Sequence, residues 1–205
     1  MSDLKGKVVL VTGAGRGAGR RVAEAFAARG AVVAANDVSP VNLDETIRRI
    51  TAAGGRVRDY VEDIAKKMPV QALLNQVQDD WKRIDVLVNC AEVEPVQALL
   101  EMDEWDWQRT LDVNLSGAFL LTQSLGRIMR QQGGGVIVHV GGRAKGTERR
   151  TAYLASKAGL EALVRSAAGE LAAFGIRVHH VQDEDGDRLV EKVLAICSGE
   201  EERRG

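Results

Sequence analysis

Short apolar runs alternate with longer amphipathic segments along this chain of 205 residues. The run Val8–Val11 is rich in β-branched residues and is typical of a strand that is buried on both faces. Further strands are predicted at Ala31–Ala35, Asp85–Asn89, Val136–Val140 and Ile176–Val181, and a weaker one at Val57–Val61. The pattern therefore predicts six strands in all.

The segments between these runs carry apolar residues at helical spacing. Ser39 and Pro40 mark a helix start, with serine as the cap and proline at the first helical position. The predicted helices cover residues 20–29, 39–53, 70–81, 103–132 in one or two pieces, 151–174 and 188–197. Alternating strands and helices favour a parallel sheet with helices on both faces. We therefore predict an α/β fold, a Rossmann-like doubly wound sheet, built as a single domain from residues 1–205.

Composition and charge exclude several classes of protein. Hydrophobic residues make up 45% and charged residues 28% of the chain, which is enough for a packed core. The net charge of −1 provides no basic field for nucleic acid or for an anionic membrane. No apolar run approaches the roughly 18 residues of a membrane span or forms a signal peptide. Two cysteines, Cys90 and Cys197, give neither a disulfide framework nor a zinc cluster, so we expect a cytoplasmic protein.

A glycine-rich turn follows the first predicted strand. Its sequence, TGAGRGAG, occupies residues 12–19 and leads directly into a predicted helix. Glycines let the backbone approach a pyrophosphate, while the helix N-terminus offers free N–H groups and the positive end of its dipole. This context favours a dinucleotide site over a plain glycine-rich turn. The phosphate-binding residues would be Gly13, Arg16, Gly17, Ala18 and Gly19.

Asp37 indicates which dinucleotide would bind. It falls at the end of the second predicted strand, about 20 residues beyond the turn, where a carboxylate can bind ribose hydroxyls. The same carboxylate would repel the 2′-phosphate of NADP. Arg16 is either a solvated cation of the turn or a group that reaches a phosphate. NAD is therefore the expected cofactor, with NADP the less favoured alternative.

Tyr153 and Lys157 stand four residues apart, on one face of a predicted helix. A tyrosine hydroxyl with a pKa near 10 is a poor acid or base at neutral pH. A nearby ammonium favours the phenolate and lowers that pKa. The pair can therefore move a proton to or from a carbonyl or alcohol oxygen.

Together these features resemble the short-chain dehydrogenase/reductase family, in order and spacing, from about Leu4 to Val181. The sequence TGAGRGAG matches the family's TGxxxGxG turn, and Asn89-Cys90-Ala91-Glu92 is similar to its NNAG motif. Tyr153 and Lys157 match the YxxxK motif, and Asn114 matches the catalytic asparagine. This resemblance implies an oxidoreductase that acts on a small-molecule alcohol or carbonyl substrate with a nicotinamide cofactor.

The resemblance also implies roles for individual residues. Tyr153 would be the general acid or base for hydride transfer, and Lys157 would hold the nicotinamide ribose hydroxyls and lower the pKa of Tyr153. Asn114 would position a water molecule in a proton relay. Asp63 and Ile64 would bind the adenine. The remaining cofactor-binding positions would be Asn89 and Ala91.

The sequence departs from the family pattern at several positions near this site. No serine lies between Ser124 and Ser156, although the family places a substrate-binding serine after its fifth strand; Thr147 or Thr151 could substitute. Glu92 replaces the glycine of NNAG. The Pro-Gly turn, the substrate-covering segment and the seventh strand of the family have no counterpart here.

Three hypotheses follow. The first is an active oxidoreductase, and the second is an impaired relative that binds dinucleotide as a sensor or interaction protein. The third is a structural partner in a mixed oligomer. The resemblance implies a homo-oligomer, a dimer or tetramer. The apolar positions available for such contacts are Leu115, Phe119, Leu120, Leu160, Leu163 and Val164.

The histidines of the last two predicted strands allow one further hypothesis. A metal site built from His139 and His179 lacks a third ligand, so a buried or hydrogen-bonded role is favoured for both and no metal is expected.

Overall fold

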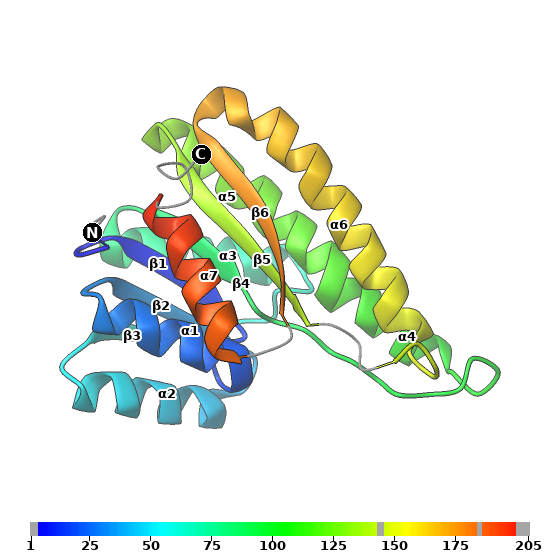
Figure 1. The fold of residues 1–205 in the computed structure, drawn as a ribbon. Helices are drawn as coiled ribbons and strands as arrows, with labels where there is room; N and C mark the ends of the chain where they lie inside the picture. The colour runs from blue at the N-terminus through cyan, green and yellow to red at the C-terminus, as the bar shows by residue number, and fades with distance from the viewer. Residues whose placement is uncertain (1–3, 143–145, 184–185, 200–205) are drawn as a thin grey trace.

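The computed structural model describes residues 4–142, 146–183 and 186–199. Its centre is a parallel sheet of six strands in the order β3-β2-β1-β4-β5-β6 (Figure 1). The strands are β1 (Val8–Thr12), β2 (Val32–Asp37), β3 (Arg56–Val61), β4 (Val86–Asn89), β5 (Gly135–Gly142) and β6 (Ile176–Asp183). The predicted six-stranded, doubly wound parallel sheet is confirmed.

Helices cover both faces of this sheet. The α-helices are α1 (Gly17–Ala28), α2 (Pro40–Ala52), α3 (Lys67–Trp81), α4 (Glu104–Leu111), α5 (Gly117–Gln132), α6 (Thr151–Leu171) and α7 (Gly186–Ser198). Buried residues of α1, α2 and α7 form one core with one face of the sheet. Buried residues of α3, α5 and α6 form a second core on the other face. None of the helices in the described ranges combines the length and apolar character that crossing a membrane requires.

Most predicted boundaries agree with the structure to within a few residues. Ser39 caps α2, since its hydroxyl accepts a hydrogen bond from the backbone N–H of Asn42. The first helix begins at Gly17 rather than at Arg20, so the glycine-rich turn itself forms its first turn. The segment predicted in one or two pieces is α4 and α5 joined by a π-helical turn, Asp112–Ser116, which hydrophobic periodicity cannot show.

The order of the strands explains where a ligand would bind. From β1 the chain adds β2 and then β3 on one side of β1 in the sheet. It then crosses to the other side of β1, where it adds β4, β5 and β6. The adjacent strands β1 and β4 therefore form the switch point, and Thr12 of β1 pairs in register with Asn89 of β4. In sheets of this kind, the crevice beyond the carboxyl ends of these strands is the usual ligand site. The segment after β4 extends away from that end of the sheet (Figure 1).

Candidate functional site

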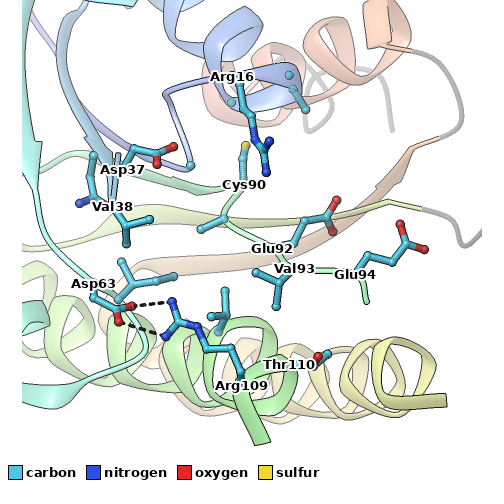
Figure 2. A pocket seen from close by; sticks show the side chains of 18 of the residues that line it. Arg16, Asp37, Val38, Asp63, Cys90, Glu92, Val93, Glu94, Arg109 and Thr110 are labelled. Carbon is cyan, nitrogen blue, oxygen red and sulfur yellow. Dashed lines mark hydrogen bonds and ion pairs between the residues drawn. The ribbon is translucent and has the colours of Figure 1, made fainter. Parts of the chain in front are cut away.

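A cleft of about 690 Å³ opens at the carboxyl ends of β1, β2 and β4 (Figure 2). This volume is typical of a small-molecule or cofactor site. The cleft is lined by Gly13, Arg16, Gly17, Ala18, Gly19, Asn36, Asp37, Val38, Glu62, Asp63, Ile64, Cys90, Ala91, Glu92, Val93, Glu94, Pro95, Trp105, Asp106, Arg109, Thr110 and Val113. It brings together most of the positions predicted to bind the cofactor, from four separate stretches of sequence.

Two glycines of the glycine-rich turn lie so close to other backbone atoms that a side chain would not fit there. A Cβ atom on Gly13 would lie 2.7 Å from the backbone nitrogen of Ala91, and Gly13 has a φ of +65°. A Cβ atom on Gly19 would collide with the carbonyl oxygen of Gly13. Gly17 begins α1 and lines the cleft, and a Cβ atom added there would meet nothing within 4 Å, so a pyrophosphate can approach the N–H groups of this helix N-terminus.

Asp37 forms one end of the cleft. Its Oδ2 accepts a hydrogen bond from the backbone N–H of Gly15 at 3.0 Å, and its Oδ1 accepts one from the N–H of Ser39 at 3.0 Å. A carboxylate has about four acceptor sites, so these two bonds fix its orientation and leave capacity for ribose hydroxyls. In Figure 2 the Arg16 guanidinium lies between Asp37 and the carboxylates of Glu92 and Glu94.

Two residues that the sequence reasoning missed support this end of the cleft. The buried Asn36 side chain donates to the carbonyl oxygens of Tyr60 and Glu62, at 3.0 Å each, and so joins the ends of β2 and β3. Arg20 donates from Nε to the hydroxyl of Thr46 at 3.0 Å and from its guanidinium to the carbonyl oxygen of Gly15. The available signal for Asn36 was a polar residue inside an apolar strand.

Asp63, predicted to bind the adenine, is held by an arginine from α4. The Arg109 guanidinium donates to Asp63 Oδ2 at 3.0 Å and to Oδ1 at 3.5 Å, and the N–H of Ala65 donates to Oδ1 at 3.1 Å. Asp63, Ile64 and Arg109 all line the cleft, and Figure 2 shows the ion pair at the edge opposite the glycine-rich turn. Sequence alone did not connect Arg109 with Asp63.

Asn89 lies beneath the cleft rather than among the residues that line it. Its side chain is buried; Oδ1 accepts from the hydroxyl of Thr12, and Nδ2 donates to His139 Nδ1 at 3.1 Å. The next residues of the chain, Cys90 and Ala91, do line the cleft. Burial raises the pKa of the Cys90 thiol to about 12, which keeps it neutral.

The predicted Tyr–Lys pair is found on α6, beside the segment that follows β4. The Lys157 ammonium lies 5.1 Å from the centre of the Tyr153 ring. Both side chains contact Glu92: its Oε2 accepts from the Tyr153 hydroxyl at 3.1 Å and lies 2.7 Å from Lys157 Nζ. Tyr153 is almost completely buried. Burial first, and then the charge and the hydrogen bond of Glu92, raise the pKa of Tyr153 above its ordinary value.

Asn114 lies at the centre of the π-helical turn and holds the segment that carries Glu92. Its Oδ1 accepts from the N–H of Val93 at 2.9 Å, and its Nδ2 donates to the carbonyl oxygen of Val93 at 2.9 Å. Nδ2 also donates to the Ser156 hydroxyl at 3.0 Å, and that hydroxyl donates to the carbonyl oxygen of Tyr153. Asn114 therefore connects the segment after β4 with α6.

The remaining sequence predictions have mixed outcomes. Thr147 is exposed, and Thr151 is the first residue of α6. Among the contacts described for these residues, neither threonine reaches the Tyr153 hydroxyl. His139 and His179 do not form a pair, because the register sets His139 opposite His180 and places His179 on the other face of the sheet. Both ring nitrogens of His139 are hydrogen-bonded, to Asn89 and to Thr122.

Comparison with known proteins places this arrangement in context. Residues 7–183 match the protein family described as short chain dehydrogenase. An oxidoreductase of Thermotoga maritima that is not characterised further is 41% identical over 181 residues, covering 87% of this chain and 71% of the relative.

Two solved structures share the fold. A metagenomic short-chain oxidoreductase in complex with NADP is 31% identical with a TM-score of 0.91, over 96% of this chain and 93% of the other. A xylitol dehydrogenase with bound NAD⁺ is 30% identical with a TM-score of 0.83, over 94% of this chain and 76% of the other.

Proposed function

This chain belongs to the short chain dehydrogenase family of oxidoreductases, and on that premise we propose that it uses NAD to interconvert a small alcohol and its carbonyl compound. The observation that carries the proposal is that the glycine-rich turn and Asp37 line one cleft, and that Glu92 of the same cleft contacts the Tyr153–Lys157 pair. The dehydrogenase and oxidoreductase names of the relatives favour an enzyme over a dinucleotide-binding sensor.

The residues at the turn fit a dinucleotide. Gly13 and Gly19 let the turn fold tightly against its own backbone and that of Ala91, and Arg16, Gly17 and Ala18 line the same wall of the cleft. We assign the pyrophosphate to this wall and the adenine to the side formed by Asp63 and Ile64.

Asp37 supports NAD rather than NADP. Its carboxylate is fixed by the N–H groups of Gly15 and Ser39 and has acceptor sites left for a ribose diol. A 2′-phosphate at the same place would meet a like charge. The similar structures include both an NADP and an NAD⁺ complex, so the preference rests on Asp37.

Tyr153 and Lys157 support the chemical role. A bound nicotinamide supplies or accepts the hydride at the substrate carbon. In reduction, the Tyr153 O–H bond breaks and its proton goes to the carbonyl oxygen; in oxidation the alcohol proton returns to Tyr153. Lys157 would donate to the ribose hydroxyls of a bound nicotinamide cofactor, and Asn114 keeps Val93 in place beside the pair.

A tyrosine-to-phenylalanine exchange tests this assignment. Tyr153→Phe removes the transferable proton, so turnover with NADH and a carbonyl panel, or with NAD and polyols, should fall about 10²- to 10⁴-fold while NADH binding persists. Tyr60→Phe is the matched control, because Tyr60 contacts Asp80 and Trp81 away from the cleft. Equal turnover of the wild-type protein and Tyr153→Phe would refute the catalytic role.

We further propose a homo-oligomer, a dimer or tetramer, formed through α5 and α6. Of the positions named for such contacts, Leu160 and Val164 belong to the core, and Leu120 and Leu163 pack against it. Phe119 on α5 is 44% exposed and is the strongest remaining candidate. Light scattering of the purified protein tests this proposal, and a monomer at high concentration contradicts it.

A further inference from the structure

Glu92 contacts both members of the Tyr153–Lys157 pair through one carboxylate oxygen. Its Oε2 accepts a hydrogen bond from the Tyr153 hydroxyl at 3.1 Å and lies 2.7 Å from Lys157 Nζ. One oxygen of Glu92 therefore contacts both the Tyr153 hydroxyl and the Lys157 ammonium, the two groups on which the proposed function depends. A catalytic meaning for this contact rests on the proposed function, whereas the contact itself is formed by the chain's own residues without a cofactor.

The contact is partly shielded from water, and hydrogen bonds hold the backbone next to Glu92. The side chain of Lys157 is 12% exposed and that of Glu92 is 36% exposed, so water screens their attraction only in part. The residue after Glu92, Val93, is held at both its N–H and its carbonyl oxygen by Asn114. The carboxylate is thus directed at the pair by the backbone that carries it.

This arrangement changes what Lys157 can do for Tyr153. A free ammonium beside the ring would stabilise the phenolate, whereas an ammonium paired with a carboxylate has much of its charge balanced. The carboxylate also accepts a hydrogen bond from the Tyr153 hydroxyl, which favours the protonated form of the tyrosine. In the described ranges, the charged or titratable groups that interact with this cluster include Glu94 and Cys90 from the segment after β4, Arg150 just before α6, His139 from β5 and His180 from β6.

We propose that Glu92 is a positioning residue that closes a Glu92–Tyr153–Lys157 triad in the free protein, holding the Tyr153 hydroxyl as a proton donor and occupying the Lys157 ammonium. Lys157 has to leave Glu92 before it can donate to a ribose hydroxyl. In the closed triad, Tyr153 stays protonated to a higher pH than an ordinary tyrosine does. Alcohol oxidation needs Tyr153 as a proton acceptor and so requires more alkaline conditions.

Phenol ionisation, followed by ultraviolet absorbance during an alkaline titration, tests the triad without any cofactor. The chain has two tyrosines, and Tyr153→Phe identifies the contribution of Tyr153. Glu92→Gln keeps the shape of the side chain and removes its charge. We expect the acid dissociation constant of the Tyr153 hydroxyl to be at least about tenfold larger in Glu92→Gln than in the wild-type protein. Circular dichroism shows whether the variant keeps its fold.

Glu94→Gln is the matched control, because Glu94 is a carboxylate two residues along the same segment and forms an ion pair with Arg150 instead. It should shift Tyr153 ionisation by much less than Glu92→Gln does. Unchanged ionisation in Glu92→Gln, or an equal shift in Glu94→Gln, would overturn the triad. If Glu92→Gln fails to fold, Glu92→Asp tests the same contact with the charge kept and the reach shortened.

NADH affinity gives a second readout. In the wild-type protein, the ion pair between Lys157 and Glu92 has to break before NADH can bind to Lys157. Glu92→Gln removes this ion pair, so NADH should bind about tenfold more tightly to the variant. Weaker or equal binding would contradict the competition for Lys157. If no variant binds NADH, the proposed function fails, while the tyrosine titration still decides whether the triad exists.

Discussion

Asn89 donates a hydrogen bond from Nδ2 to Nδ1 of His139 at 3.1 Å, across the neighbouring strands β4 and β5. The other ring nitrogen of His139 lies 2.8 Å from the hydroxyl of Thr122, which itself donates to the carbonyl oxygen of Ala118. Donation therefore runs in one direction, from Thr12 through Asn89 and the neutral His139 to Thr122. A protonated imidazole has no acceptor for the Asn89 amide, so this chain of bonds requires the uncharged ring.

Acid should destabilise the protein partly through this histidine. Burial lowers the pKa of His139 from 6.5 to about 3 in the folded state. Between these pH values the unfolded chain binds a proton that the folded chain does not, so the free energy of unfolding falls as the pH falls through that window. Urea unfolding at several pH values should show a smaller acid dependence for His139→Asn than for the wild-type protein.

His180→Asn is the control for this series, because His180 is only half-buried and its pKa is lowered for the same principal reason. It should remove a smaller part of the acid dependence. An identical acid dependence in the wild-type protein and His139→Asn would show that His139 is not held neutral by the fold.

Much of the fold was predictable because it follows from local patterns. The apolar runs at Val8–Val11 and Val136–Val140 identify strands, and the Ser39-Pro40 pair identifies a helix start, because burial and capping depend on neighbouring residues. The start of α1 at Gly17 was missed, since glycine is a weak helix former that the turn accepts for close backbone approach.

The details of the site were less predictable because they depend on residues far apart in the sequence. Tyr153 and Glu92 are separated by 61 positions, and Arg109 and Asp63 by 46. No local pattern gives the orientation of such side chains. The sequence identified Glu92 as a departure from a family motif, but only the fold shows that its carboxylate meets the Tyr–Lys pair.

Asn114 should matter for stability as well as for the site. Asn114→Ala removes three side-chain hydrogen bonds and leaves both polar groups of the Val93 backbone without this partner, so we expect a loss of about 2–3 kcal/mol in the free energy of unfolding. Urea unfolding measures the loss. Asn75→Ala, at an exposed position of α3, should stay within about 0.5 kcal/mol of the wild-type protein, and a similar loss in both variants would contradict the account.

Asp37 should set the choice of cofactor. Asp37→Ser removes the charge that opposes a 2′-phosphate and one strong acceptor for ribose hydroxyls, so NADPH binding should tighten and NADH binding should weaken, each by about tenfold or more. Calorimetric titration of both cofactors measures these changes. Asp44→Ser, on the exposed side of α2, is the control and should leave both affinities unchanged. If Asp37→Ser kept the same preference between NADH and NADPH, a residue other than Asp37 would determine the choice of cofactor.

The most direct test of the central claim is a calorimetric titration of the purified wild-type protein with NADH and, separately, with NADPH. The account predicts that NADH binds and that its affinity exceeds that of NADPH by about tenfold or more, because Asp37 accepts from a ribose diol and repels a phosphate. Binding of neither cofactor, or tighter binding of NADPH, would contradict it.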